Sequence, residues 1–148
     1  MAAILTKVGK ADPQVVALAN RHYSRRRPGK QVGSPARSLV LRDAAGLVGF
    51  VWTWARDGYR VDRQTGANCE LFRREGGPRA SDLILEAERW VVETWPEVRR
   101  FYTYVDPARV RSGNPGYCFL CAGYHRAGTT PSGKLLLVKE LKGGANGH

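Results

Sequence analysis

The stretch from Cys69 to Trp95 constrains the fold of this chain more than any other part of the sequence. It begins with a strand-like segment, continues through a Gly-Gly-Pro turn and ends in a segment with helical periodicity. Ser81 precedes the periodic segment and is expected to cap the helix, with Asp82 beside the positive end of the helix dipole. Apolar residues at helical spacing predict one buried face, made of Leu83, Ile84, Ala87, Trp90, Val91 and Trp95.

The glycine turn in this stretch predicts an anion site. A strand that enters a helix through glycines directs backbone N–H groups and the helix dipole toward one point, which suits a negatively charged group. Arginines crowd the same turn, Arg73 among them. The residues expected to bind a donor or another anion here are Arg74, Gly76, Gly77, Arg79 and Ser81.

Length and composition indicate one globular domain. The chain has 148 residues, 43% of them hydrophobic, with four Trp, and we expect a domain over residues 1–142 and a frayed tail over 143–148. It contains no apolar run of 18 residues, which argues against a transmembrane helix, and no signal-peptide pattern, which favours the cytoplasm. Three Cys, an odd number, argue against a disulfide scaffold.

The net charge predicts the type of partner. Lys and Arg number 24 against 13 Asp and Glu, so the chain carries +11, and Arg, the better ligand for phosphate, outnumbers Lys. Such a balance in a small domain favours a nucleic-acid partner. The alternative is a GC-rich genome that prefers Arg codons, together with a solvated surface.

Strand and helix signals predict a mixed α/β domain in the order β-α-β-β-β-α-β-α-β-β. Its first half should be antiparallel, and the strands flanking the central helix should form one parallel pair. Asp12 and Pro13 predict the start of the first helix, and Asn114 with Pro115 the start of the last. The expected strands are Ile4–Val8, Ser38–Arg42, Leu47–Ala55, Asn68–Arg73 and Arg100–Val105, followed by the helix Tyr117–Ala122 and a hairpin from Tyr124 to Val138.

Two basic loops are candidates for binding a nucleic-acid backbone. Three adjacent arginines stand in a loop rich in Pro and Gly, a pattern suited to contacting successive phosphates. A second basic loop follows the strand that ends at Asp106. The residues predicted to bind nucleic acid are Arg25, Arg26, Arg27, Lys30, Arg109 and Arg111.

Strand ends supply the first catalytic candidates. Asp106 ends a strand just before Pro107, where it would hold an amine, orient a base or cap the following turn. Glu70 and Arg73 are three residues apart and point to opposite faces of a regular strand, so they share a pocket only if the strand bulges or splays. Arg73 would bind a donor carboxylate or a DNA phosphate, or form a surface ion pair with Glu75 or Asp82.

The end of the first helix adds His22 and Tyr23. Histidine is a proton shuttle near neutral pH and also a metal ligand. Tyr23, Tyr59 and Tyr104 would stack on a base or pack in the core.

Cysteine spacing suggests a metal site only weakly. Cys118 and Cys121 form a CxxC pair inside the short predicted helix, and His125 or Cys69 would have to complete four ligands. No second CxxC exists, so we interpret the cysteines as free thiols. If a metal is bound, ligand hardness favours His22 with Asp106 or Glu70.

The element order, with its central strand–turn–helix unit and short late helix, resembles the GNAT (N-acetyltransferase) fold over most of the chain. In that fold a Q/R-x-x-G-x-G/A turn holds the pyrophosphate of coenzyme A. Ala80 matches the last small position, but Pro78 stands at the first Gly and Glu75 at the Gln or Arg. A proline removes one N–H donor and a glutamate repels the pyrophosphate, so the two departures argue against acetyl-CoA.

Four short segments are similar to the Mom-like phage DNA-modification proteins, a GNAT-like family. The segments are His22-Tyr23, Glu70-Leu71-Phe72-Arg73, Thr103-Tyr104-Val105-Asp106 and Phe119 to Gly128, in the same order along the chain. Phe119 stands where a Tyr is expected, so any hydroxyl role there is lost or moved.

This resemblance implies a transferase that adds a glycine-derived acetamido group, or a similar small acyl group, to the N6 amine of adenine in phage DNA. It implies an anti-restriction role, iron as a cofactor, the host cytoplasm as location and DNA and a small-molecule donor as partners, while a homodimer is compatible with the sequence. The catalytic residues expected are Asp106, Arg73, His22, Glu70 and Tyr23, around a pocket that receives a base taken out of the stack.

Two other functions stay open from the sequence. One is an acetyl-CoA-dependent N-acetyltransferase of a small amine or a modified base. The other is a nucleic-acid-binding module on the same fold without catalysis.

Overall fold

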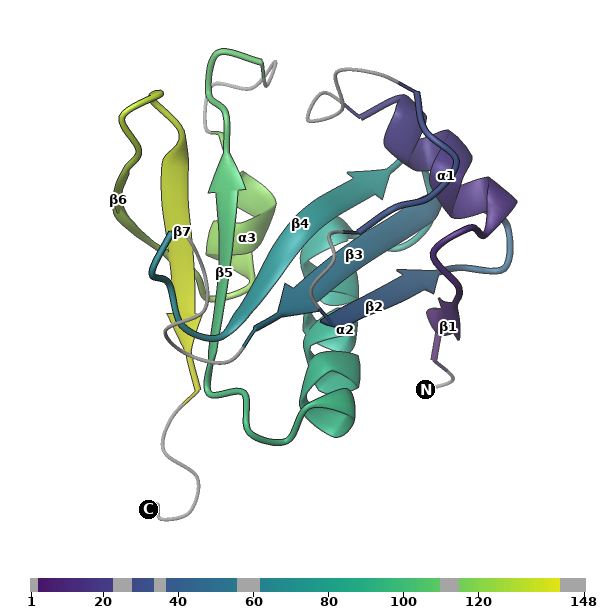
Figure 1. Cartoon of the computed structure of the whole chain (residues 1–148), viewed down its shortest axis with the longest axis horizontal. Helices are drawn as coiled ribbons and strands as arrows, with labels where there is room; N and C mark the ends of the chain where they lie inside the picture. Colours follow the sequence, from purple (N-terminus) through teal and green to yellow (C-terminus); the bar gives the residue numbers. More distant parts are fainter. Residues whose placement is uncertain (1–2, 23–27, 34–36, 56–61, 110–114, 142–148) are drawn as a thin grey trace.

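A computed structural model describes residues 3–22, 28–33, 37–55, 62–109 and 115–141 of the chain. These residues form a seven-stranded sheet in the order β1-β2-β3-β4-β5-β7-β6 (Figure 1). The strands are β1 (Thr6–Val8), β2 (Arg37–Arg42), β3 (Val48–Trp54), β4 (Ala67–Arg74), β5 (Arg100–Val105), β6 (His125–Thr129) and β7 (Leu135–Glu140). Helix α1 (Pro13–Asn20) lies on one face of the sheet, and α2 (Ala80–Thr94) and α3 (Tyr117–Cys121) lie on the other (Figure 1).

Each face of the sheet has its own apolar cluster. On the α1 side, Val15 and Ala19 pack on Val51 and Leu71. On the α2 side the larger cluster contains the fully buried Phe50, Trp52 and Phe101 together with the apolar face of α2. Of that predicted face, Trp90 is only half-buried, whereas the charged Glu86 and Glu88 are buried.

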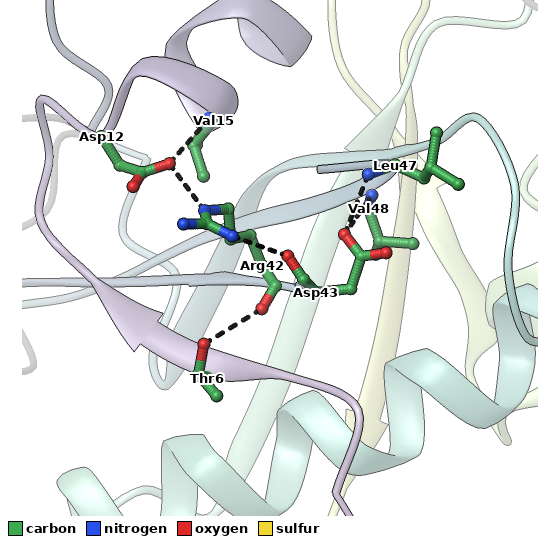
Figure 2. A network of polar contacts seen from close by, with 7 residues as sticks. All are labelled: Thr6, Asp12, Val15, Arg42, Asp43, Leu47 and Val48. Atoms are coloured by element: carbon green, nitrogen blue, oxygen red, sulfur yellow. Dashed lines mark hydrogen bonds and ion pairs between the residues drawn. The ribbon is translucent and has the colours of Figure 1, made fainter. Parts of the chain in front are cut away.

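A polar network joins α1 to the hairpin between β2 and β3 (Figure 2). Asp12 caps α1 by accepting a hydrogen bond from the Val15 N–H at 3.1 Å, and it accepts another from Arg42 Nε at 2.9 Å. Asp43 Oδ1 accepts hydrogen bonds from the N–H groups of Leu47 at 2.9 Å and Val48 at 3.0 Å. The predicted cap is therefore confirmed, and Arg42 links it to the hairpin turn.

The pairing of β4 with β5 determines where a site can form. The two strands are parallel, as predicted, but only three residues of each are in register, from Ala67 opposite Phe101 to Cys69 opposite Thr103. Beyond this point β4 runs on to Arg74 and β5 to Val105 while the strands diverge (Figure 1). The two backbones therefore no longer pair at the carboxyl ends of β4 and β5, and we call this splayed region in the middle of the sheet the opening.

Two predicted helix starts are wrong. Helix α2 begins two residues earlier than expected, with Arg79 as its N-cap, and Ser81 lies buried inside the first turn. The short helix α3 has Gly116 as its N-cap, in the left-handed conformation that glycine adopts without strain, so Pro115 is outside the helix. Asn114 and the tail 143–148 lie outside the described residues. No helix of the described residues is long and apolar enough to cross a membrane.

Candidate active site at the opening between β4 and β5

A β-bulge at Glu70 shapes the β4 side of the opening. The register with β3 pairs Trp52 with Cys69 but Val51 with Leu71, so Glu70 is the extra residue. A bulge shifts the following residues to the other face, which brings side chains three apart onto one side of the strand. Glu70 and Arg73 therefore both lie on the α1 side, the arrangement that the sequence allowed only for an irregular strand.

Polar contacts fix the position of both side chains. Glu70 Oε2 accepts a hydrogen bond from Thr53 Oγ1 at 2.9 Å, and Thr53 shares the α1-side face with Val51. Arg73 Nη1 donates to the carbonyl of Arg21, at the end of α1, at 2.8 Å. Glu70 is half-buried beyond the last β4–β5 pair, so its carboxylate is placed beside the opening.

Asn68 lies one step deeper on the same face. It is opposite Thr53 on β3 and Tyr102 on β5, and only 6% of its surface is exposed. Its Oδ1 atom is buried without a hydrogen-bond partner in the described structure. A buried unpaired acceptor costs free energy, so Asn68 marks a position where the fold keeps a polar group despite its cost.

The β5 side of the opening is lined by two tyrosines and an aspartate. The Tyr104 hydroxyl donates to Asp62 Oδ2 at 3.0 Å, and the Tyr102 hydroxyl donates to the same oxygen at 3.4 Å. The rings of Tyr102 and Tyr104 meet edge to face, with centroids 5.9 Å apart. Tyr104 is half-buried and follows the last paired residue Thr103, so it faces the opening from the strand opposite Glu70.

A cluster of charged groups closes the end of α1 against β4. Glu75 accepts two hydrogen bonds from Arg21, at 2.7 Å from Nε and 2.9 Å from Nη2, and a third from Arg73 Nε at 2.6 Å. The hydrogen bonds from Arg21 and then Arg73 lower the pKa of the Glu75 carboxyl to about 2. The ion pair with Glu75 that the sequence offered as the plain alternative for Arg73 is therefore present.

His22 is beside this cluster. Burial, and then the positive charge of Arg73, lower the pKa of the His22 imidazole to about 4. The ring is therefore neutral near pH 7 and supplies no positive charge to the site.

The glycine turn and the first turn of α2 lie on the other side of β4. Arg74 donates to the carbonyls of Pro78 at 2.6 Å and Gly77 at 2.8 Å, which closes the turn. Arg79 caps α2 without a side-chain hydrogen bond, and its guanidinium is 78% exposed beside Asp82 at 3.5 Å. The first N–H groups of a helix have no intrahelical acceptors, so this helix start keeps the donors that suit an anion.

The short helix α3 provides no hydroxyl at Phe119. That ring is buried and meets Phe72 and Tyr124 edge to face. The Tyr124 hydroxyl is buried beside Glu88, and the ring of Tyr117 on the first turn of α3 is 60% exposed.

The three cysteines are free thiols, as predicted. Cys69 is buried, Cys118 is half-buried and Cys121 is exposed, and burial raises the pKa of the Cys69 and Cys118 thiols.

The remaining predicted site residues that the structure describes lie in two loops. Asp106 Oδ1 accepts a hydrogen bond from the Ala108 N–H at 3.0 Å, so this carboxylate caps the turn after β5. Lys30 and Arg109 are exposed in separate loops, after α1 and after β5. Tyr23, Arg25, Arg26, Arg27, Tyr59 and Arg111 lie outside the described residues.

No metal site accompanies these residues. Among the described side chains, no group of three His, Cys, Asp or Glu could hold a metal ion. His22 has the guanidinium of Arg73 as its neighbour, which opposes a cation there. The described residues thus do not fit the iron that the resemblance implies.

Charge is distributed unevenly over the fold. Residues 80–97, which comprise α2 and the turn after it, contain five carboxylates and one arginine, a net charge of −4. Since the whole chain carries +11, all other residues together carry +15. The positive charge is therefore concentrated away from α2.

The architecture of the sheet and its helices is the GNAT acetyltransferase fold, and comparison with solved structures confirms this assignment. The chain is similar to the GNAT domain of S. lividans PAT, with a TM-score of 0.63 and 16% identity over 93% of this chain and 89% of that one. It is similar to aminoglycoside N-acetyltransferase AAC(6')-Ib11, with a TM-score of 0.61 and 16% identity over 95% and 97% of the two chains.

A third similar structure, aminoglycoside acetyltransferase AAC(6')-Ib, was solved in complex with coenzyme A. Its TM-score is 0.55, and it is 14% identical over 93% of this chain and 94% of that one. No family model matches the chain, and no curated protein matches it in sequence. The shared property is the fold.

Sequence reasoning missed several residues that the structure brings to the site. Thr53, Asn68 and Asp62 are short polar residues in or next to apolar strands, and Arg21 is hidden among many arginines. A polar side chain at a central strand position, such as Asn68 between Ala67 and Cys69, is the signal that could have identified the opening.

Proposed function

We propose that this chain transfers a small acyl-type or acetamido group from a donor to an amine, and that the amine is the N6 amine of adenine in DNA. The observation that supports transfer most directly is the opening between β4 and β5. It places the Glu70 carboxylate and the Tyr104 hydroxyl on facing strands, with a helix start suited to an anionic donor on the other side of β4.

For an acyl group, the proposed reaction forms a bond between the amine nitrogen and the carbonyl carbon of the donor. The bond from that carbon to the leaving group breaks, and the amine loses a proton. Glu70 accepts this proton, directly or through one water, because its carboxylate is held by Thr53 at the opening. The leaving group departs with its electron pair beside the start of α2, where N–H donors and the helix dipole stabilise negative charge.

DNA is the proposed acceptor because charge and geometry favour a polyanion that presents an amine. The residues outside α2 and its following turn carry +15, which attracts phosphate, and Arg is the better phosphate ligand. The opening itself is lined by hydrogen-bond acceptors, Glu70 and Asp62, which suit an amino group. An exocyclic amine becomes reachable when its base leaves the stack or is single-stranded.

The second candidate is an acetyl-CoA-dependent N-acetyltransferase of a small amine or a modified base. The fold supports it, and one structurally similar protein binds coenzyme A. Glu75, which would repel a pyrophosphate, is neutralised by Arg21 and Arg73 and so opposes the cofactor less than the sequence alone predicts. Pro78 still lacks the N–H that the turn would donate.

The experiment that tests the proposal is nucleoside mass spectrometry of DNA from cells that express the chain, with Glu70→Gln as the matched inactive control. A heavier deoxyadenosine that appears with the natural chain and is absent with Glu70→Gln supports the proposal, and its mass identifies the group. Unmodified DNA from cells that also contain a replicating phage overturns DNA modification. Thermal stabilisation by acetyl-CoA would then favour the second candidate, and DNA binding without a mass change a binding module.

A further inference from the structure

We infer that Arg21 and Arg73 form a binding site for a phosphate of the nucleic-acid backbone, and that Glu75 occupies this site in the free protein. The inference deepens the proposed function and rests on it for the identity of the polyanion.

The geometry of the cluster is that of a bound oxyanion. Arg21 donates to both carboxylate oxygens of Glu75, at 2.7 Å and 2.9 Å, the parallel two-bond arrangement with which arginine also holds a phosphate. Arg73 adds a third hydrogen bond at 2.6 Å to one of the same oxygens. Two guanidinium groups therefore converge on one anionic group.

The two arginines are held in place by more than the carboxylate. Arg73 also donates to the Arg21 carbonyl at 2.8 Å, so one arginine positions the backbone of the other. Arg21 follows α1 directly, where its N–H donates to the Leu18 carbonyl at 3.1 Å. A site that keeps its donors oriented when its internal anion leaves is preorganised for another anion.

The cluster is accessible to a large partner. The side chains of Arg21, Arg73 and Glu75 are 50%, 32% and 25% exposed, so the ion pairs are at the surface. Surface ion pairs contribute little net stability, which makes Glu75 replaceable by a competing anion.

The position of the cluster assigns it to the acceptor side. Arg73 lies on the α1 side with Glu70, whereas Arg74 and the start of α2 lie across β4. A donor anion at α2 and a phosphate at Arg21 would therefore lie on opposite sides of the strand that carries Glu70. A phosphate next to a base in the opening is thus the anion expected here, not the phosphates of a coenzyme.

Glu75→Gln tests the inference because it removes the carboxylate charge and keeps the side-chain size. The matched control is Asp82→Asn, which changes the net charge by the same amount at another exposed arginine–carboxylate pair, Arg79–Asp82. Binding of a fluorescent single-stranded 12-mer DNA that contains adenine is measured at several salt concentrations. Glu75→Gln should bind about tenfold more tightly near 0.1 M salt and steepen the salt dependence by about one to two phosphate contacts, against about twofold for Asp82→Asn.

Further variants show whether the gain in DNA affinity of Glu75→Gln comes from Arg21 and Arg73. Replacing Arg21 and Arg73 by Ala in the Glu75→Gln background should remove it. Equal binding by Glu75→Gln and Asp82→Asn, or weaker binding by Glu75→Gln than by the natural chain, overturns the inference. A gain in affinity for coenzyme A instead of DNA also overturns it, because the site would then serve the donor.

The outcome is separable from that of the proposed function. Modified deoxyadenosine without a gain for Glu75→Gln leaves the transfer reaction standing and rejects the phosphate site. A gain for Glu75→Gln with unmodified DNA keeps the phosphate site and rejects the transfer to adenine.

Discussion

The carboxylate of Glu70 accepts a hydrogen bond from the hydroxyl of Thr53, 2.9 Å away on β3, and this bond anchors the bulge that brings Glu70 to the opening between β4 and β5. Replacing Glu70 by Gln keeps the size of the side chain and its bond to Thr53 but removes the proton acceptor. We expect kcat to fall by about 100-fold with little change in KM, because general-base catalysis contributes factors of this order.

Steady-state rates of group transfer check this prediction, with Glu140→Gln as the control. Glu140 ends β7 and is exposed, so its substitution should leave the rate unchanged. A Glu70→Gln variant as active as the natural chain would exclude Glu70 as the base. Thr53→Val should lower the rate less than Glu70→Gln does, because it only loosens the position of the carboxylate.

The contrast between Glu70 and α2 explains what the sequence could predict. The period of 3.6 in α2 and the alternating strands arise from burial, which leaves a regular pattern in the residue order, and the fold follows from them. The bulge at Glu70 depends on the pairing of β4 with β3, and the divergence of β4 from β5 depends on strands whose paired residues are 34 apart in the chain. Such non-local pairings leave no periodic signal, so the shared face of Glu70 and Arg73 and the contacts of Arg21 required the structure.

The two helix caps show the same difference between local patterns, which the sequence reveals, and contacts that only the structure reveals. Asp12 was predictable because its carboxylate acts three residues along the chain, on the Val15 N–H. Ser81 has the same chemistry but is buried in the first turn of α2, because the glycine turn closed by Arg74 allows the helix to start at Ala80. The burial of Ser81 shows that the packing of the first turn of α2 decided between two acceptable local solutions.

The amide of Asn68 should not stabilise the fold, and we expect it to be retained for function. Its Oδ1 is buried without a partner in the described structure, so Asn68→Leu, which keeps the shape and removes the polar atoms, should raise the free energy of unfolding by about 1 kcal/mol. The matched control is Asn20→Leu, because Asn20 bonds the backbone of Gly29 in both directions, at 2.9 Å and 3.4 Å, and its loss should destabilise. Urea unfolding measures both. Destabilisation by Asn68→Leu would show that the amide is structural.

The buried ion pair between α2 and β7 predicts a larger effect. Lys139 Nζ donates to Glu88 Oε1 at 2.7 Å and to the Ala122 carbonyl at 2.8 Å, and the two side chains are 21% and 8% exposed. Lys139→Met leaves Glu88 buried without its cation and should lower the free energy of unfolding by about 3 kcal/mol. Adding Glu88→Leu should restore part of the loss, whereas Lys134→Met in the exposed hairpin turn should change little. Equal stability of Lys139→Met and Lys134→Met would contradict the prediction.

Stability should fall in mild acid because of His22. Burial and the charge of Arg73 lower the pKa of its imidazole from 6.5 to about 4 in the folded chain, so below pH 6.5 the unfolded chain binds the proton more strongly. The stabilising contribution is therefore complete above pH 6.5 and is lost as the pH falls toward 4. Relative to His22→Gln, which cannot titrate, the natural chain should lose about 2 to 3 kcal/mol between pH 7 and pH 4. Urea unfolding at a series of pH values measures this difference. A difference between the natural chain and His22→Gln that does not change with pH would mean that the imidazole titrates normally, and that it lies outside the field of Arg73.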